Sequence, residues 1–164
     1  MKVLRVNRGY RDFGINLGLP VFYVECGSGI NKDPLKVIEE LHEDGLNSRM
    51  WVVCQSLLGE RDAGTFVGSL KKLGCYVEIE HDGLGKVPGW YPQIDRWIVD
   101  WIKDTEWNYG AMRPNRDMLV CRDESKTDEF LAEKSQALKV LVVKDRAEVW
   151  DRVKNLTVRV YEGR

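Results

Sequence analysis

The sequence lacks an apolar run of 18 residues, so no segment is long and apolar enough to form a membrane-spanning helix. Its first residues, MKVLRVNRGYRDFG, contain no apolar signal-peptide stretch, and we therefore expect a cytoplasmic protein. An excess of one charge is also missing, because 25 Lys and Arg face 26 Asp and Glu, which gives a net charge of −1. Nucleic-acid-binding proteins usually carry a basic excess or a basic stripe, so this balance disfavours nucleic acid as a partner.

Closely spaced cysteines are missing as well. The four cysteines, Cys26, Cys54, Cys75 and Cys121, are all more than twenty residues apart, so there is no C-x-x-C pair and no zinc-finger spacing. Reduced, buried thiols are the ordinary interpretation in a cytoplasmic chain. The alternative is a metal protein in which Cys26, Cys54 and Cys121, each at the end of an expected strand, converge on one ion.

The 164 residues, 43% of them apolar, suffice for one domain with a real core. Short apolar runs alternate with amphipathic segments along the whole chain, which is typical of parallel β-α units. The strands are expected at residues 21–25, 51–54, 76–80, 118–120, 138–143 and 157–161. Helices are expected from Asp33 to Gly45, from about Asp62 to Gly74, and at residues 125–134 and 147–154. The pattern predicts a single α/β domain over residues 1–164, folded as an incomplete, mostly parallel β/α barrel.

The rhythm changes at residues 84–115, which contain the four tryptophans Trp90, Trp97, Trp101 and Trp107. From Ile94 to Ile102 the apolar residues follow the i, i+3, i+4, i+7 spacing of an amphipathic helix. Such a helix can pack on its own domain through its tryptophans. It can also face a partner, and the large aromatic area favours an interface with a partner protein or a second copy of the chain.

Ligand sites of parallel α/β folds lie at the carboxyl ends of the strands. These ends carry several polar or flexible residues, which we consider candidates for ligand binding. They are Gly27, Ser28, Gly29, Gln55, Glu78, Glu80, His81 and Asp82. The Gly27–Gly29 stretch is expected to be a turn that could seat a phosphate, although it forms no known phosphate-loop motif. Glu25 and Arg122 also fall at strand ends. No Ser-His-Asp or Cys-His order indicates a nucleophile, so the catalytic residues stay unknown.

Three parts of the chain carry a family resemblance. Residues 3–7 and 18–24 look like an opening strand followed by a strand that enters a cofactor loop. Residues 70–83 (LKKLGCYVEIEHDG) look like a helix end, a strand and a Glu-Thr-Asn-Gly turn, with Glu80 and Gly83 retained and Asp82 in place of the Asn. Residues 137–145 (ALKVLVVKD) resemble a Glu-Leu-Lys-Phe-Val-Val strand. Together these segments resemble 7-carboxy-7-deazaguanine synthase, a dimeric radical S-adenosylmethionine enzyme family with a partial barrel.

The chain departs from this family where the cofactors bind. The family's three cluster cysteines should follow Val24, but Ser28 stands at the first of them and no cysteine follows until Cys54. Residues 54–58 replace a Gly-Gly-Glu-Pro segment, and Arg11–Gly14 replace a glutamine-glycine-glutamate loop. Because an iron–sulfur cluster needs its thiolates, we expect neither a cluster nor cleavage of S-adenosylmethionine.

The resemblance and its departures imply a shortened, cluster-less pseudoenzyme that binds a partner protein or a pterin- or deazaguanine-like small molecule. One alternative is an enzyme of the deazaguanine pathway, or of different chemistry, that uses Glu78, Glu80, His81 and Asp82 in the barrel cavity. The metal protein with converging cysteines is the other.

Overall fold

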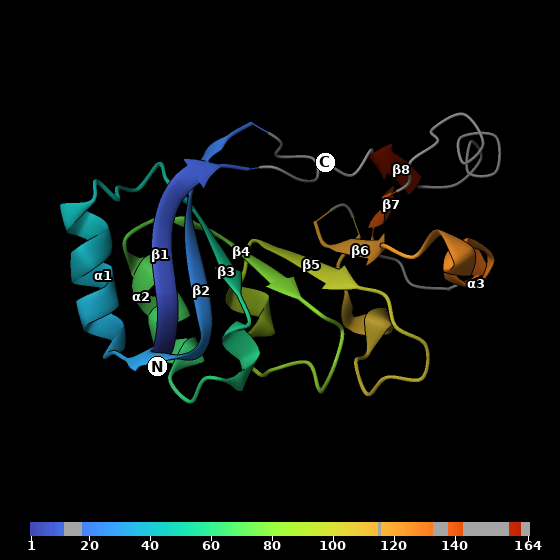
Figure 1. Ribbon diagram of the computed structural model, residues 1–164, viewed down its shortest axis with the longest axis horizontal. Coiled ribbons are helices and arrows are strands. Elements are labelled where there is room, and N and C mark those ends of the chain that lie inside the picture. Colours follow the sequence, from blue (N-terminus) through green and yellow to red (C-terminus); the bar gives the residue numbers. More distant parts are fainter. Residues whose placement is uncertain (12–17, 115, 133–137, 143–157, 162–164) are drawn as a thin grey trace.

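The computed structural model describes residues 1–11, 18–114, 116–132, 138–142 and 158–161 (Figure 1). The predicted helix at residues 147–154 lies outside this part of the chain. None of the described helices is long and apolar enough to cross a membrane.

An eight-stranded sheet runs through the domain, with the strands in sequence order from β1 to β8. β1 pairs with β2 in antiparallel fashion, and every following pair is parallel. The sheet stays open, because β1 and β8 are its two ends. The strands are β1 (Lys2–Tyr10), β2 (Pro20–Asn31), β3 (Trp51–Gln55), β4 (Tyr76–His81), β5 (Arg96–Asp100), β6 (Met118–Cys121), β7 (Leu138–Val142) and β8 (Val158–Tyr161). The expectation of a mostly parallel α/β fold is confirmed.

In the described part of the chain, three α-helices join consecutive strands: α1 (Pro34–Glu43) follows β2, α2 (Ala63–Lys72) follows β3 and α3 (Thr127–Ala132) follows β6. The Asp33 side chain caps α1 by accepting a hydrogen bond from the backbone N–H of Leu35 at 2.8 Å, and Pro34 occupies the first turn. The apolar sides of α1 and α2 form the core together with alternate residues of the strands. These core residues include Val37, Leu41, Phe66, Leu70, Phe22, Val24, Val52, Cys54, Val77 and Ile79.

Strand residues alternate between two faces of the sheet. On β2 to β4 the residues between the core positions include Tyr23, Glu25, Gln55, Glu78 and Glu80. We call the side of the sheet that bears them the polar face. It lies opposite the face that α1 and α2 cover.

The helix predicted from Ile94 to Ile102 is wrong, because residues 96–100 form β5 (Figure 1). A helix with that apolar stripe would expose Val99, but Trp97, Ile98 and Val99 are all buried. A strand in the middle of a parallel sheet is covered on both faces, so it needs consecutive apolar residues. The two patterns coincide over this short stretch, and the apolar spacing alone could not separate them.

The turn predicted at Gly27–Gly29 is also wrong. β2 continues to Asn31, and Val3 of β1 lies opposite both Cys26 and Ile30, so Gly27, Ser28 and Gly29 form a bulge in β2. A Cβ atom on Gly29 would lie 2.7 Å from the carbonyl oxygen of Val3, which only glycine avoids. The glycines therefore serve the close approach of two backbones.

The tryptophans of residues 84–115 pack within their own chain. Trp97 is fully buried and Trp107 is 3% exposed, which corrects the expectation that they face a partner. Trp90 and Trp101 are half-buried and also pack on the core. Trp97 stacks on Tyr91 with ring centroids 4.8 Å apart, and Trp101 meets the edge of Phe130 at 6.0 Å. An interface with a partner protein or a second copy of the chain through Trp90 or Trp101 stays a prediction.

Candidate functional site

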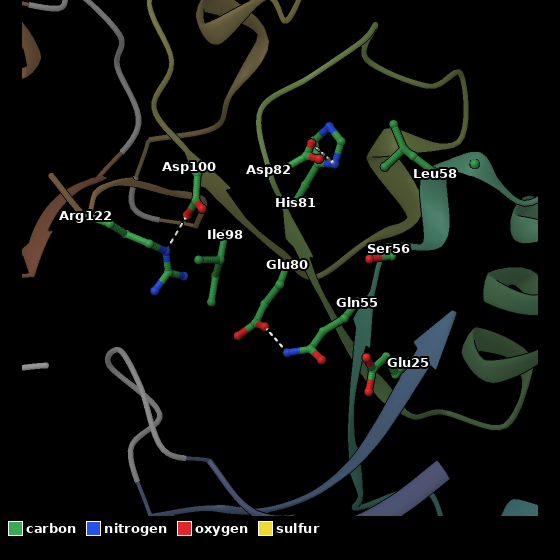
Figure 2. Close-up of a pocket in the computed structure, with 11 residues that line it drawn as sticks. Glu25, Gln55, Ser56, Leu58, Glu80, His81, Asp82, Ile98, Asp100 and Arg122 are labelled. Atoms are coloured by element: carbon green, nitrogen blue, oxygen red, sulfur yellow. Dashed lines mark hydrogen bonds and ion pairs between the residues drawn. The ribbon is translucent and has the colours of Figure 1, made fainter. Parts of the chain in front are cut away.

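A pocket of about 420 Å³ lies at the carboxyl edge of the parallel strands (Figure 2). β3, β4 and β5 contribute residues at or next to their carboxyl ends, β2 contributes Glu25, where its parallel pairing with β3 ends, and one residue directly follows β6. The pocket is lined by Glu25, Gln55, Ser56, Leu58, Gly59, Glu80, His81, Asp82, Ile98, Asp100 and Arg122. This is the place at which parallel α/β sheets bind their ligands.

Strand register explains why these side chains meet. Glu25 pairs with Gln55, Gln55 with Glu80, and Glu80 with Ile98, so one residue from each of four neighbouring strands forms a straight row. Residues paired across parallel strands point to the same face of the sheet. The row lies on the polar face and lines the pocket.

Glu80 is held at both carboxylate oxygens. Arg11 Nη2 lies 2.5 Å from Oε1, and Gln55 Nε2 donates a hydrogen bond to Oε2. The Glu80 side chain is 18% exposed, so it still reaches the pocket. A carboxylate accepts about four hydrogen bonds, which leaves Glu80 with acceptor capacity toward a ligand.

His81 and Asp82 form the next part of the wall. His81 Nε2 donates to the carbonyl oxygen of Leu84 at 2.7 Å, and Nδ1 lies 3.4 Å from Asp82 Oδ1. The ring packs against Trp107 with centroids 4.5 Å apart. Burial lowers the pKa of His81, so the imidazole is neutral at pH 7. It therefore adds no positive charge to the pocket.

Asp100, at the end of β5, and Arg122, directly after β6, form the pocket wall on that side of the sheet. Arg122 Nε donates to Asp100 Oδ1 at 2.8 Å (Figure 2). Burial raises the pKa of Asp100, and the hydrogen bond from Arg122 opposes this rise. With Glu25, Glu80 and Asp82, four acidic side chains line the pocket. Arg5, Arg11 and Arg122 pair with Glu25, Glu80 and Asp100. The carboxylate oxygens still offer acceptor sites, so the pocket favours ligands that donate hydrogen bonds.

The structure brings together four of the sequence-predicted candidates, namely Gln55, Glu80, His81 and Asp82. Glu78 lies one row deeper on the polar face and is fully buried beside Arg11. Gly27, Ser28 and Gly29 do not line the pocket, because they sit in the bulge against β1. Ile98 and Asp100 were missed because the spacing of β5 favours a helix, while Glu25 and Arg122 had the signal of a strand-end position.

The cysteines do not form a metal centre at this edge. Cys54 on β3 and Cys121 on β6 are separated by β4 and β5, which places their strands about 14 Å apart at the usual spacing. Burial raises the pKa of Cys26 to about 12 and that of Cys54 well above its usual value, so both thiols stay protonated. Among the described residues, no three His, Cys, Asp or Glu side chains are arranged to hold a metal ion.

Gly83 directly follows the pocket residue Asp82, and the backbone conformation at this position requires a glycine. Its φ is +78°, and a Cβ atom there would lie 2.2 Å from the carbonyl oxygen of Asp100. We expect Gly83→Ala to lower the free energy of unfolding by roughly 2–4 kcal/mol, because left-handed strain and overpacking add. Urea denaturation measures this loss.

Gly85 provides the matched control. Its φ is +79°, but no atom lies within 4 Å of a Cβ built there. Gly85→Ala should therefore show only the strain of the left-handed backbone. Equal losses for the two variants would mean that the contact with Asp100 does not constrain the pocket wall.

The chain matches no protein-family model, no curated protein and no solved structure. What the site can bind must therefore be argued from its own chemistry.

Proposed function

We propose that this chain binds a small planar heterocycle of the pterin or deazaguanine class in the carboxyl-edge pocket, without radical chemistry. In this proposal the open parallel sheet is the incomplete barrel of a radical S-adenosylmethionine enzyme that lacks its cluster. The missing cysteine triplet after Val24 supports the absence of that chemistry, since three thiolates hold such a cluster.

The observation that carries the proposal is the acceptor row of Glu25, Gln55 and Glu80. Gln55 uses one amide hydrogen on Glu80, so its carbonyl oxygen is available as a further acceptor beside the two carboxylates. Pterins and 7-deazaguanines share an edge on which a ring N–H and an exocyclic amino group lie side by side. Two adjacent donors of this kind fit a carboxylate in the two-pronged geometry that also joins arginine to carboxylates.

The rest of the pocket suits the same ligand. Leu58 and Ile98 offer apolar surface to a ring, and a volume of about 420 Å³ holds a bicyclic heterocycle. A protein partner has less support, because the tryptophans that suggested an interface include Trp97 and Trp107, which are buried in the chain's own core. We therefore favour the small molecule.

Titration of the protein with 7-deazaguanine and with pterin, followed by calorimetry, tests the proposal. We expect Glu80→Gln to weaken binding about 10- to 150-fold, since a hydrogen bond to a charged group contributes about 1.5–3 kcal/mol. An analogue without the exocyclic amino group should lose a similar factor against the wild type.

Glu39→Gln is the matched control, because Glu39 is an exposed residue of α1 on the far side of the sheet. This variant should bind like the wild type. Melting curves of both variants show whether the fold is kept. Absence of binding to the wild type, or equal affinities of the wild type and Glu80→Gln, would refute the proposal.

A further inference from the structure

Arg11 directly follows β1, and its side chain lies beside Glu78 and Glu80 of β4. Its backbone N–H donates to the carbonyl oxygen of Leu19 at 2.8 Å, and its own carbonyl oxygen accepts from the N–H of Gly18 at 2.7 Å. The end of β1 and the start of β2 are thereby fixed to each other at this residue. The side chain is 1% exposed, so the whole guanidinium is inside the protein.

The guanidinium lies between two carboxylates of one strand. Nε is 2.9 Å from Glu78 Oε1, and Nη2 is 2.5 Å from Glu80 Oε1. Glu78 and Glu80 are two residues apart on β4 and therefore share the polar face. Tyr23 of β2 hydrogen-bonds to the same guanidinium. Burial alone would lower the pKa of Arg11, but the two carboxylates outweigh it and raise the pKa, so the cation persists.

The two sides of the Glu80 carboxylate are thus held by one residue of β3 and one residue that directly follows β1. Arg11 engages Oε1 and Gln55 engages Oε2. These two contacts fix the orientation of the Glu80 side chain. Its remaining acceptor sites are then available to a ligand in the pocket. Arg11 itself does not line the pocket.

We propose that Arg11 is the positioning residue of this site: its fork between Glu78 and Glu80 keeps the Glu80 carboxylate aimed at the ligand. The inference rests on the proposed function, because it states how the acceptor row is maintained. Arginine is required for this role, since its planar fork spans two carboxylates at once. Lysine is a point charge on a flexible chain and retains the charge but not the geometry.

The test compares Arg11→Lys and Arg11→Met with the wild type in the calorimetric titration with 7-deazaguanine. We expect Arg11→Met to weaken binding at least about tenfold, with Arg11→Lys between it and the wild type. Without the guanidinium, Glu80 keeps only its contact with Gln55, so the orientation of its carboxylate is no longer fixed.

A second readout needs no ligand. The side-chain amide signals of Gln55 in a ¹⁵N–¹H spectrum report its hydrogen bond to Glu80. We expect them to move toward those of a solvent-exposed glutamine in Arg11→Met and to move less in Arg11→Lys. If Arg11→Met does not fold, Arg11→Lys alone carries the comparison in both measurements.

The outcomes separate this inference from the proposed function. Wild-type binding that Glu80→Gln weakens, combined with unchanged affinity and unchanged Gln55 signals in the Arg11 variants, would overturn the role of Arg11 alone. Variants that only melt at lower temperature would overturn it in the same way, because a purely structural arginine changes neither the affinity nor the Gln55 signals. A wild type that binds neither probe overturns both.

Discussion

Replacing Trp97 by alanine will lower the free energy of unfolding by about 3–5 kcal/mol, the usual range for a large aromatic side chain removed from a core. Trp97 is fully buried on β5. Its ring lies 4.8 Å from that of Tyr91, 5.5 Å from that of Trp90 and 5.6 Å from that of Trp107. Its Nε1 donates to the carbonyl oxygen of Tyr91 at 3.1 Å. Guanidinium denaturation followed by circular dichroism measures the loss.

Trp101→Ala is the control for this experiment. Trp101 is half-buried and meets Phe130 at its edge, so its removal should cost less than that of Trp97. Sedimentation of both variants beside the wild type shows whether either tryptophan supports self-association. A Trp97→Ala protein of near wild-type stability, with weakened association, would contradict the packing of Trp97 in the core and return it to an interface.

Replacing Asp117 by alanine will lower the free energy of unfolding by about 3–5 kcal/mol, the usual cost of removing one partner of a buried ion pair. Asp117 is fully buried and directly precedes β6 in the sequence. It accepts hydrogen bonds from Tyr91 Oη at 2.5 Å, from the Trp97 N–H at 3.0 Å and from Arg113 Nη2 at 2.7 Å. Asp117→Ala leaves all of these donors without their acceptor, and thermal or chemical denaturation at pH 7 measures the effect.

The pH dependence of this loss follows from the same contacts. Burial would raise the pKa of Asp117, but the hydrogen bonds from Arg113 and Tyr91 outweigh it and lower the pKa. A carboxyl group with a lowered pKa stabilises the folded state above its ordinary pKa, and this contribution is lost as the pH falls through the folded value. The difference between the wild type and Asp117→Ala should therefore be full at pH 7 and narrow below about pH 4–5. A difference that stays constant down to pH 3 would contradict this assignment.

Much of the fold could be predicted because its signals are local. The Asp33-Pro34 start of α1 and the apolar runs of β3, β4 and β6 depend on capping and on burial from both sides, and both leave a mark within a few residues. β5 resembles a helix in the sequence because Ile94, Trp97, Ile98 and Trp101 follow the helical spacing. The strand itself needs only the consecutive apolar residues 97–99. Only the burial of Val99, which depends on the neighbouring strands, separates the two.

The sequence predicts those site residues that follow from correctly placed strand ends. Gln55, Glu80, His81 and Asp82 were found because parallel strands present their carboxyl ends at one edge. Asp100 was missed because the sequence around β5 was interpreted as a helix. Arg11 could not be found by any local pattern, because its contact with Glu78 joins residues 67 positions apart.

A crystal structure of the complex with 7-deazaguanine tests the central claim most directly, since it shows both the place and the contacts of the ligand. The account predicts the heterocycle in the carboxyl-edge pocket, with its ring N–H and amino group donating to Glu80 and its plane beside Ile98. Arg11 should keep its contacts with Glu78 and Glu80 in that complex. A ligand bound elsewhere on the chain, or bound in the pocket with its donor edge turned away from Glu80 and Gln55, would contradict it.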